Sequence, residues 1–132
     1  CGRGGRTGRR RGGHAAHLAL EQVLRNWDPR AYHRESRRFH LALITPCRMH
    51  RLLNMFESAW NVTEPFQPMQ HVPGPDRDQL HADHQEMLDA FVTRDSAALL
   101  AASGRITSAW RRSSRRCRKI YESRHRSAIF ST

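Results

Sequence analysis

The sequence predicts an all-α fold, an antiparallel bundle of about five to six helices. Apolar residues recur at spacings of three and four along several long segments, which is the period of a helix that buries one side. Capping residues and prolines separate these segments. No segment alternates apolar and polar residues between hairpin turns, as exposed strands do. The 132 residues suffice for one domain with a modest core.

Five helices follow from this pattern in chain order. Asp28 is a good N-cap and Pro29 suits the first position of a helix, so one helix ends and another begins at this point. Asp95 can cap a later helix in the same way. Residues 61–76 contain four prolines and a glycine, and we expect a loop without regular structure there. We expect the helices at about residues 15–27, 29–44, 49–60, 77–92 and 96–110.

The third helix carries the strongest apolar stripe. Met49, Leu52, Leu53, Phe56 and Trp60 follow one another at helical spacing. Such a stripe is far more often core than cofactor site, so we expect these side chains to be buried.

The net charge of +11 is concentrated at the two ends of the chain. Residues 1–13 hold five arginines, six glycines and no acidic residue, which predicts a disordered arm. Residues 14–110 form the expected domain, and residues 111–132 form a basic tail that is either a helical extension or disordered. Between residues 14 and 104, nine basic residues face eleven acidic ones, so nucleic-acid binding is not the evident role of the globular part.

Histidines on two helices could meet inside such a bundle. Ser36 and His40 are four residues apart and share one side of their helix, and His81 and His84 are three apart on another. Facing helices of a bundle can build metal sites from such residues. The alternative is a set of core histidines held by hydrogen bonds, because a buried imidazole needs partners for its ring nitrogens.

Three segments resemble a known family. They are RRFHLAL, CRMHRLLNMFESAW and DRDQLHADHQEMLDAFVTRDSAALLAA, separated by the proline-rich loop. Over about residues 29–106 they look like FCD, the C-terminal effector-binding domain of GntR-type (FadR-like) bacterial transcription regulators. Members of that family join a winged helix-turn-helix, which binds operator DNA as a dimer, to this helical bundle. The bundle encloses a cavity for a small carboxylate, often beside a divalent metal.

The resemblance also implies site residues. His40 and His84 match two histidines of the family's metal set, which would hold zinc or nickel. Ser36 stands where the family has Asp or Asn, and the last histidine falls at Ile106 or, with a shift of one residue, at Arg105. Because two of the four ligand positions are replaced, a metal cofactor is doubtful. Stand-in ligands would have to come from Glu35, His33 or His81.

The effector would be met by other polar residues. Arg77 matches a family position that often approaches the ligand, and its forked guanidinium suits a carboxylate. A solvated charge in the first turn of a helix is the alternative for Arg77. His81 and Ser36 complete the predicted ligand-binding set.

The expected function is therefore that of an effector-binding and dimerisation domain of a transcription regulator, truncated and without its own DNA-binding domain. We expect a cytoplasmic homodimer that binds a small carboxylate and no membrane. We do not expect an enzyme, because no carboxylate pair, activated nucleophile or phosphate loop accompanies the histidines. The alternative function is non-specific nucleic-acid binding through the arginine-rich termini.

Overall fold

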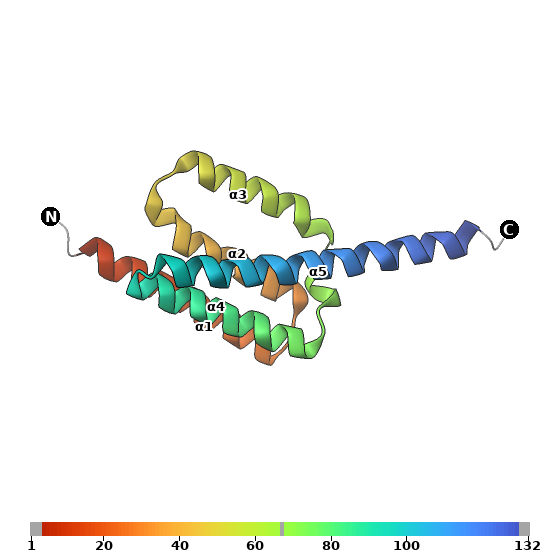
Figure 1. Ribbon diagram of the computed structural model, residues 1–132, viewed down its shortest axis with the longest axis horizontal. Helices are drawn as coiled ribbons and strands as arrows, with labels where there is room; N and C mark the ends of the chain where they lie inside the picture. Colours follow the sequence, from red (N-terminus) through yellow and green to blue (C-terminus); the bar gives the residue numbers. More distant parts are fainter. Residues whose placement is uncertain (1–3, 67, 130–132) are drawn as a thin grey trace.

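The computed structural model describes residues 4–66 and 68–129, which are helical and contain no strand. Consecutive helices run in opposite directions (Figure 1), so the predicted all-α antiparallel bundle is confirmed. None of the helices in these ranges has the length and apolar content needed to cross a bilayer. The five α-helices are α1 (Gly4–Arg25), α2 (Pro29–Ile44), α3 (His50–Thr63), α4 (Gly74–Thr93) and α5 (Ser96–Ile129).

Two aspartates set helix boundaries as predicted. The Asp28 side chain accepts hydrogen bonds from the backbone N–H groups of Arg30, at 2.9 Å, and Ala31, at 3.2 Å. Asp95 accepts one from the N–H of Ala98 at 2.9 Å. Each carboxylate therefore satisfies amide groups that have no partner within the first turn of α2 or α5.

The proline-rich segment is more ordered than the sequence predicts. Residues 61–76 include the end of α3, the 3-10 turns η2 (Glu64–Phe66) and η3 (Pro68–His71), and the first turn of α4. A further 3-10 turn, η1 (Thr45–Cys47), joins α2 to α3. Proline is compatible with the first turn of a helix, where its missing N–H costs nothing, so a proline-rich stretch need not be a loop.

The core lies between α1, α2, α4 and α5. Contacts are most extensive between α4 and α5 and between α1 and α2, and η3 closes the end of the bundle against α5. Tyr32, Phe39 and Leu20 are fully buried. The buried apolar cluster consists of Leu20, Tyr32, Phe39, Leu43, Met69, Val72, Leu80, Met87, Leu88, Ala102 and Ile106.

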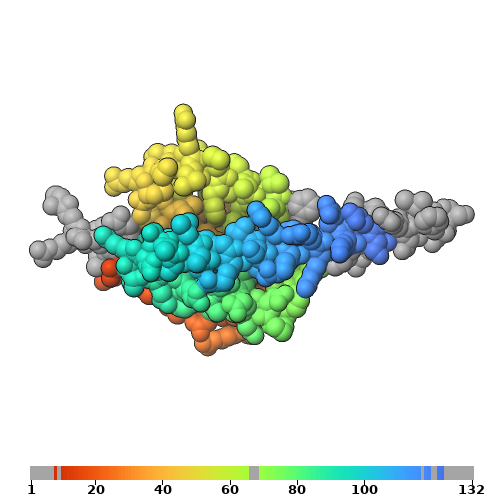
Figure 2. Space-filling view, viewed as in Figure 1, coloured from red at the N-terminus to blue at the C-terminus, as the bar shows by residue number. Residues whose placement is uncertain are grey.

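The prediction that the apolar stripe of α3 is core is wrong for most of the helix. Trp60 is buried, but Leu52 is 43% exposed and Met49, just before the helix, is 59% exposed. α3 packs lightly on α2 and lies along the outside of the bundle, where it forms a separate ridge in the space-filling view (Figures 1 and 2). Periodicity showed that α3 has an apolar side, but it could not show what covers that side.

α1 and α5 are longer than the sequence predicts. α1 begins at Gly4, so it runs through most of the arm predicted to be disordered, and α5 continues past Trp110 to Ile129. Residues 1–3 and 130–132 of the predicted arm and tail lie outside the described residues. The buried Gly13 explains the order in the arm, because it lets the backbone of α1 lie close to Leu43 and Leu88.

A matched pair of glycine substitutions tests this packing of α1. A Cβ at Gly12 would meet nothing within 4 Å, whereas one at Gly13 would lie 2.9 Å from Leu88 Cδ1. Gly12→Ala should raise the free energy of unfolding by about 0.5–1 kcal/mol, because alanine is the better helix former. Gly13→Ala should raise the free energy of unfolding by less, or not at all, because the Leu88 side chain must move aside. Urea unfolding measures both, and equal effects of the two substitutions would contradict the close approach of α1.

Candidate functional site

An open pocket of about 410 Å³ lies between α2, α3, α4 and α5. Its walls are mostly aromatic and aliphatic, with three hydroxyl side chains and one imidazole. The size and the apolar lining suit a small organic molecule. The lining residues are His40, Ile44, Phe56, Ala59, Trp60, Thr63, Met87, Ser103, Ile106, Thr107 and Trp110.

The three hydroxyl groups of the pocket already donate hydrogen bonds to their own helices. Thr63 Oγ1 donates to the carbonyl of Trp60 at 2.8 Å, and Thr107 Oγ1 donates to that of Ser103 at 2.9 Å. Ser103 Oγ donates in the same way to the carbonyl of Leu99 at 2.8 Å. Toward the pocket these oxygens therefore offer lone pairs rather than protons. Hydrogen-bond donors for a ligand must come from elsewhere in the wall.

Two side chains of the wall, Trp60 and His40, carry a ring N–H group. Trp60 Nε1 is buried and has no hydrogen-bond partner in the described part of the chain. The His40 ring lies 5.9 Å from the Trp60 ring and 6.2 Å from that of Phe56, measured between centroids. An unpaired buried donor costs about 1–3 kcal/mol, so a ligand that supplies an acceptor oxygen here would recover part of that cost.

Behind the pocket, His84 connects α4 to α2 through a buried hydrogen bond. Its Nδ1 lies 2.7 Å from the carbonyl oxygen of Leu80, and its Nε2 lies 3.2 Å from Ser36 Oγ. A carbonyl can only accept, so Nδ1 carries the proton. Nε2 of the neutral ring then accepts the hydroxyl proton of Ser36. Both ring nitrogens are thus satisfied in an environment where an unpaired one would be costly.

Burial keeps the imidazoles of this region neutral. Desolvation lowers the pKa of His84 well below its ordinary value of 6.5, and the nearby His40 ring lowers it further. Desolvation also lowers the pKa of His40, to about 4. The His40 and His84 rings lie 5.1 Å apart between centroids, so the sequence prediction that the two helices bring their histidines together agrees with this geometry.

The other predicted histidines lie elsewhere. His81 stacks on His17 of α1 at 4.6 Å between centroids, on the side of α4 away from the pocket walls. His33 packs against Trp60 at 4.9 Å and against Trp110. Burial lowers the pKa of all three of these histidines.

Arg77 and Glu35, which the sequence analysis named as candidate site residues, have partners away from the pocket. Arg77 Nε donates to the carbonyl of Val72 at 2.8 Å, and its guanidinium lies 4.0 Å above the Trp27 ring. Glu35 pairs with Arg34 and Arg38, its neighbours on α2. Arg77 is therefore not in the pocket wall, and its role in ligand binding stays a prediction.

The residues at the histidine pair do not fit a metal centre. The lone pair of His84 that a metal would use is engaged by the Ser36 hydroxyl. The described residues include no group of three or more His, Cys, Asp or Glu side chains that could hold a metal ion. Of the two candidates for the missing histidine, Ile106 faces the pocket, and Arg105 pairs with Asp83 and Glu86. Two imidazoles alone bind zinc or nickel poorly, so metal binding by His40 and His84 stays a prediction without structural support.

Sequence reasoning missed most of the pocket. Trp60 was expected in the core, and Trp110 only marked the end of a helix. His17, the stacking partner of His81, was not singled out. A signal existed in the two tryptophans and Phe56, since aromatic residues line most small-molecule sites, but only the packing of four helices shows that they meet.

The neutral histidines predict a loss of stability in mild acid. The unfolded chain protonates its histidines below about pH 6.5, whereas folded His40 stays neutral to about pH 4. The unfolded state therefore binds more protons between these values, and the free energy of unfolding should fall as the pH drops through this window. Urea unfolding at about pH 7.5, 6 and 5 measures this fall in the free energy of unfolding.

Histidine substitutions separate this effect from general acid sensitivity. His40→Leu should remove up to about 2 kcal/mol of the loss between pH 7.5 and pH 5, because the unfolded state no longer gains that proton. His50→Gln, at an exposed position, is the control and should leave the pH dependence unchanged. If both variants lose stability with pH as the parent does, His40 is not held neutral in the folded state.

Comparison with known proteins identifies the domain. Residues 8–109, which are most of the chain, match the FCD domain family. No curated protein and no solved structure matches the chain. The match includes α2, α3, α4, most of α1 and α5 as far as residue 109, and so all of the pocket-lining residues except Trp110. The chain therefore belongs to the FCD domain family, the effector-binding regulatory domains of GntR-type transcription regulators.

Proposed function

We propose that the pocket between α2, α3, α4 and α5 is the effector site of this regulatory domain. The observation that carries the proposal is the pocket itself, about 410 Å³ in volume and enclosed by four helices of the matched family region. A ligand in contact with all four helices would favour the arrangement that holds it best. In a regulator, a ligand that favours one arrangement of the helices shifts the protein toward that conformation, and this couples ligand binding to regulation.

The lining suggests the chemistry of the effector. No lining residue is an arginine or lysine, and His40 is neutral at physiological pH. An apolar body, aromatic or branched, would fill most of the space, and an acceptor oxygen would meet His40 and Trp60 Nε1. The carboxylate expected for the family can serve as that acceptor, although it would bind without a cation, which makes its desolvation costly. A neutral carbonyl would avoid this cost.

Dimerisation belongs to the same proposal. The outer side of α3 exposes Leu52, Met55 and Val62, which lie within an arc of about 80° on the helix, and Met49, just before the helix, is exposed as well. Exposed apolar side chains on one helix are typical of surfaces that pack against a partner. A second copy of the chain on this side would place each pocket next to the dimer contact through α3. Ligand-biased packing could then change the spacing of two DNA-reading domains in an intact regulator.

A pair of tryptophan substitutions tests the pocket. Thr107 lines it, and Ser108, the next residue of α5, does not. Each hydroxyl bonds to the carbonyl four residues before it, at 2.9 Å, so the local cost of replacement is matched. Thr107→Trp should fill the pocket and abolish probe binding, whereas Ser108→Trp should bind as the parent does.

The probes are 1-naphthoate and its neutral methyl ester, followed by calorimetry and by the shift in melting temperature. Binding of either probe to the parent and to Ser108→Trp, with loss in Thr107→Trp, supports the pocket. Tighter binding of the ester would indicate a neutral acceptor, and tighter binding of naphthoate would indicate a carboxylate effector. Equal binding to both tryptophan variants, or no binding to the parent, would refute this pocket as the effector site.

A further inference from the structure

α5 carries a second feature that the pocket does not use. Beyond Trp110 the helix continues past the rest of the bundle toward the C-terminus (Figure 1). This part is rich in arginine, and its basic side chains between residues 111 and 119 are exposed. We call six of these residues the basic face: Arg111, Arg112, Arg115, Arg116, Arg118 and Lys119.

The six cations share one side of the helix. Successive residues of an α-helix are rotated by about 100°, which places all six within an arc of about 160°. The opposite side holds Ser113, which is buried, and Trp110, which faces the pocket. The six side chains of the basic face are exposed along about two turns of the helix, and two of them, Arg112 and Arg116, lie beside α4, where they line a pocket with Asp76.

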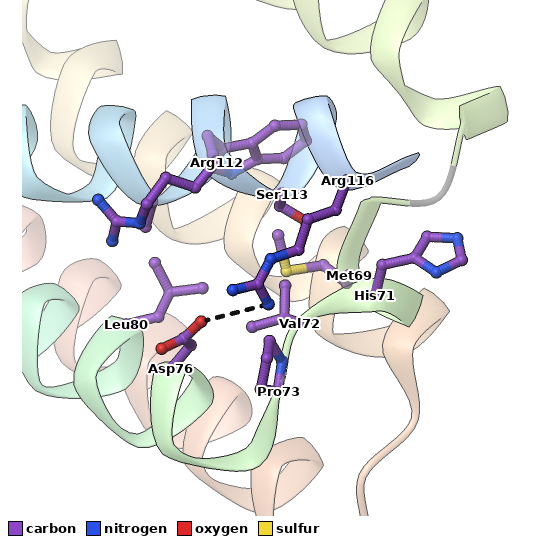
Figure 3. A pocket seen from close by; sticks show the side chains of 11 residues that line it. Met69, His71, Val72, Pro73, Asp76, Leu80, Arg112, Ser113 and Arg116 are labelled. Carbon is purple, nitrogen blue, oxygen red and sulfur yellow. Dashed lines mark ion pairs between the residues drawn. The ribbon is translucent and has the colours of Figure 1, made fainter. Parts of the chain in front are cut away.

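Most of this charge has no acidic partner. Arg116 reaches Asp76 at 3.9 Å, as Figure 3 shows, while Arg112 points away from that carboxylate. Arg118 lies 3.7 Å from Glu122 on the same helix. Arg111, Arg112, Arg115 and Lys119 make no ion pair with the described residues. Four like charges close together on one helix are unfavourable unless anions from outside neutralise them.

We propose that the basic face binds the phosphate backbone of duplex DNA without reading its sequence. The forked guanidinium of arginine matches phosphate oxygens, and five of the six cations are arginines. A helix fits the major groove of B-form DNA, which is about 12 Å wide, whereas the deep and narrow major groove of duplex RNA excludes it. The side chains that the structure describes between residues 111 and 119 are arginine, lysine and serine, none of which inserts between lipids as an apolar anchor, and this favours nucleic acid over a membrane surface. This contact is independent of the proposed effector site.

Two quadruple variants with equal loss of charge test the proposal in the full chain. In the first, Arg111, Arg112, Arg115 and Lys119 are replaced by glutamine. In the control, glutamine replaces four exposed arginines elsewhere, Arg25, Arg48, Arg51 and Arg94. Circular dichroism of both variants checks that the helices remain. Fluorescence anisotropy with a labelled DNA duplex of about 20 base pairs and unrelated sequence measures affinity between about 50 and 200 mM salt.

The parent should bind the duplex with an affinity that falls steeply with salt. The first variant should bind at least about tenfold more weakly at low salt, and the slope against salt should become shallower by up to about 0.9 for each phosphate that the variant no longer neutralises. The control should retain most of the parent's affinity.

Three results would overturn the proposal. Equal losses in the two variants would show that only net charge matters. Unchanged binding in the first variant would assign the contact to another part of the chain, such as the arginines before residue 13. Equal or tighter binding to duplex RNA, or to vesicles of phosphatidylcholine and phosphatidylglycerol, would show a different partner.

Discussion

The interior of this bundle depends on a neutral imidazole at His84. Its two nitrogens hold α4 to α2 through Ser36 and fix the ring against the carbonyl of Leu80 within its own helix. The rings of Phe39, His40 and Tyr32 pack around it at 5.1 to 6.2 Å between centroids. A charged ring could not keep the acceptor role toward Ser36 and would be buried without a counter-charge, which is costly at this depth. The hydrogen bond that joins α2 to α4 in this form therefore requires this one protonation state.

The neutral state of the buried histidines also limits what the pocket can bind, because His40 in its wall carries no charge. The wall presents aromatic faces, hydroxyl lone pairs and two ring N–H groups, and no lining residue is an arginine or lysine. The Ser36 hydroxyl engages the lone pair of His84 that a metal would need. His84 is thus a hydrogen-bonded structural group that joins α4 to α2. In the proposed effector site, recognition would then rest on shape, apolar contact and an acceptor oxygen, with no cation in the wall.

Those features of the fold and of the candidate site that depend on local chemistry could be predicted from the sequence. Asp28 and Asp95 cap their helices through their own side chains, and the spacing of four residues places Ser36 and His40 on one side of α2. That His84 of α4 could meet them was a possibility that the spacing left open. The extent of α1 could not be predicted in this way, because it depends on Gly13 resting against leucines of two other helices. The exposure of α3 and the pocket that it helps to form depend equally on long-range packing. Composition located the basic end of the chain, but only the helix itself shows that its cations share one side.

Nitrogen NMR of the His84 ring at neutral pH tests the central claim most directly, because the chemical shifts and couplings of the two ring nitrogens report which of them carries a proton. The account predicts a neutral ring protonated at Nδ1, with Nε2 as the acceptor of the Ser36 hydroxyl, and no change of state as the pH falls through 6.5. A ring protonated at Nε2, or one that titrates near its ordinary pKa of 6.5, would contradict it.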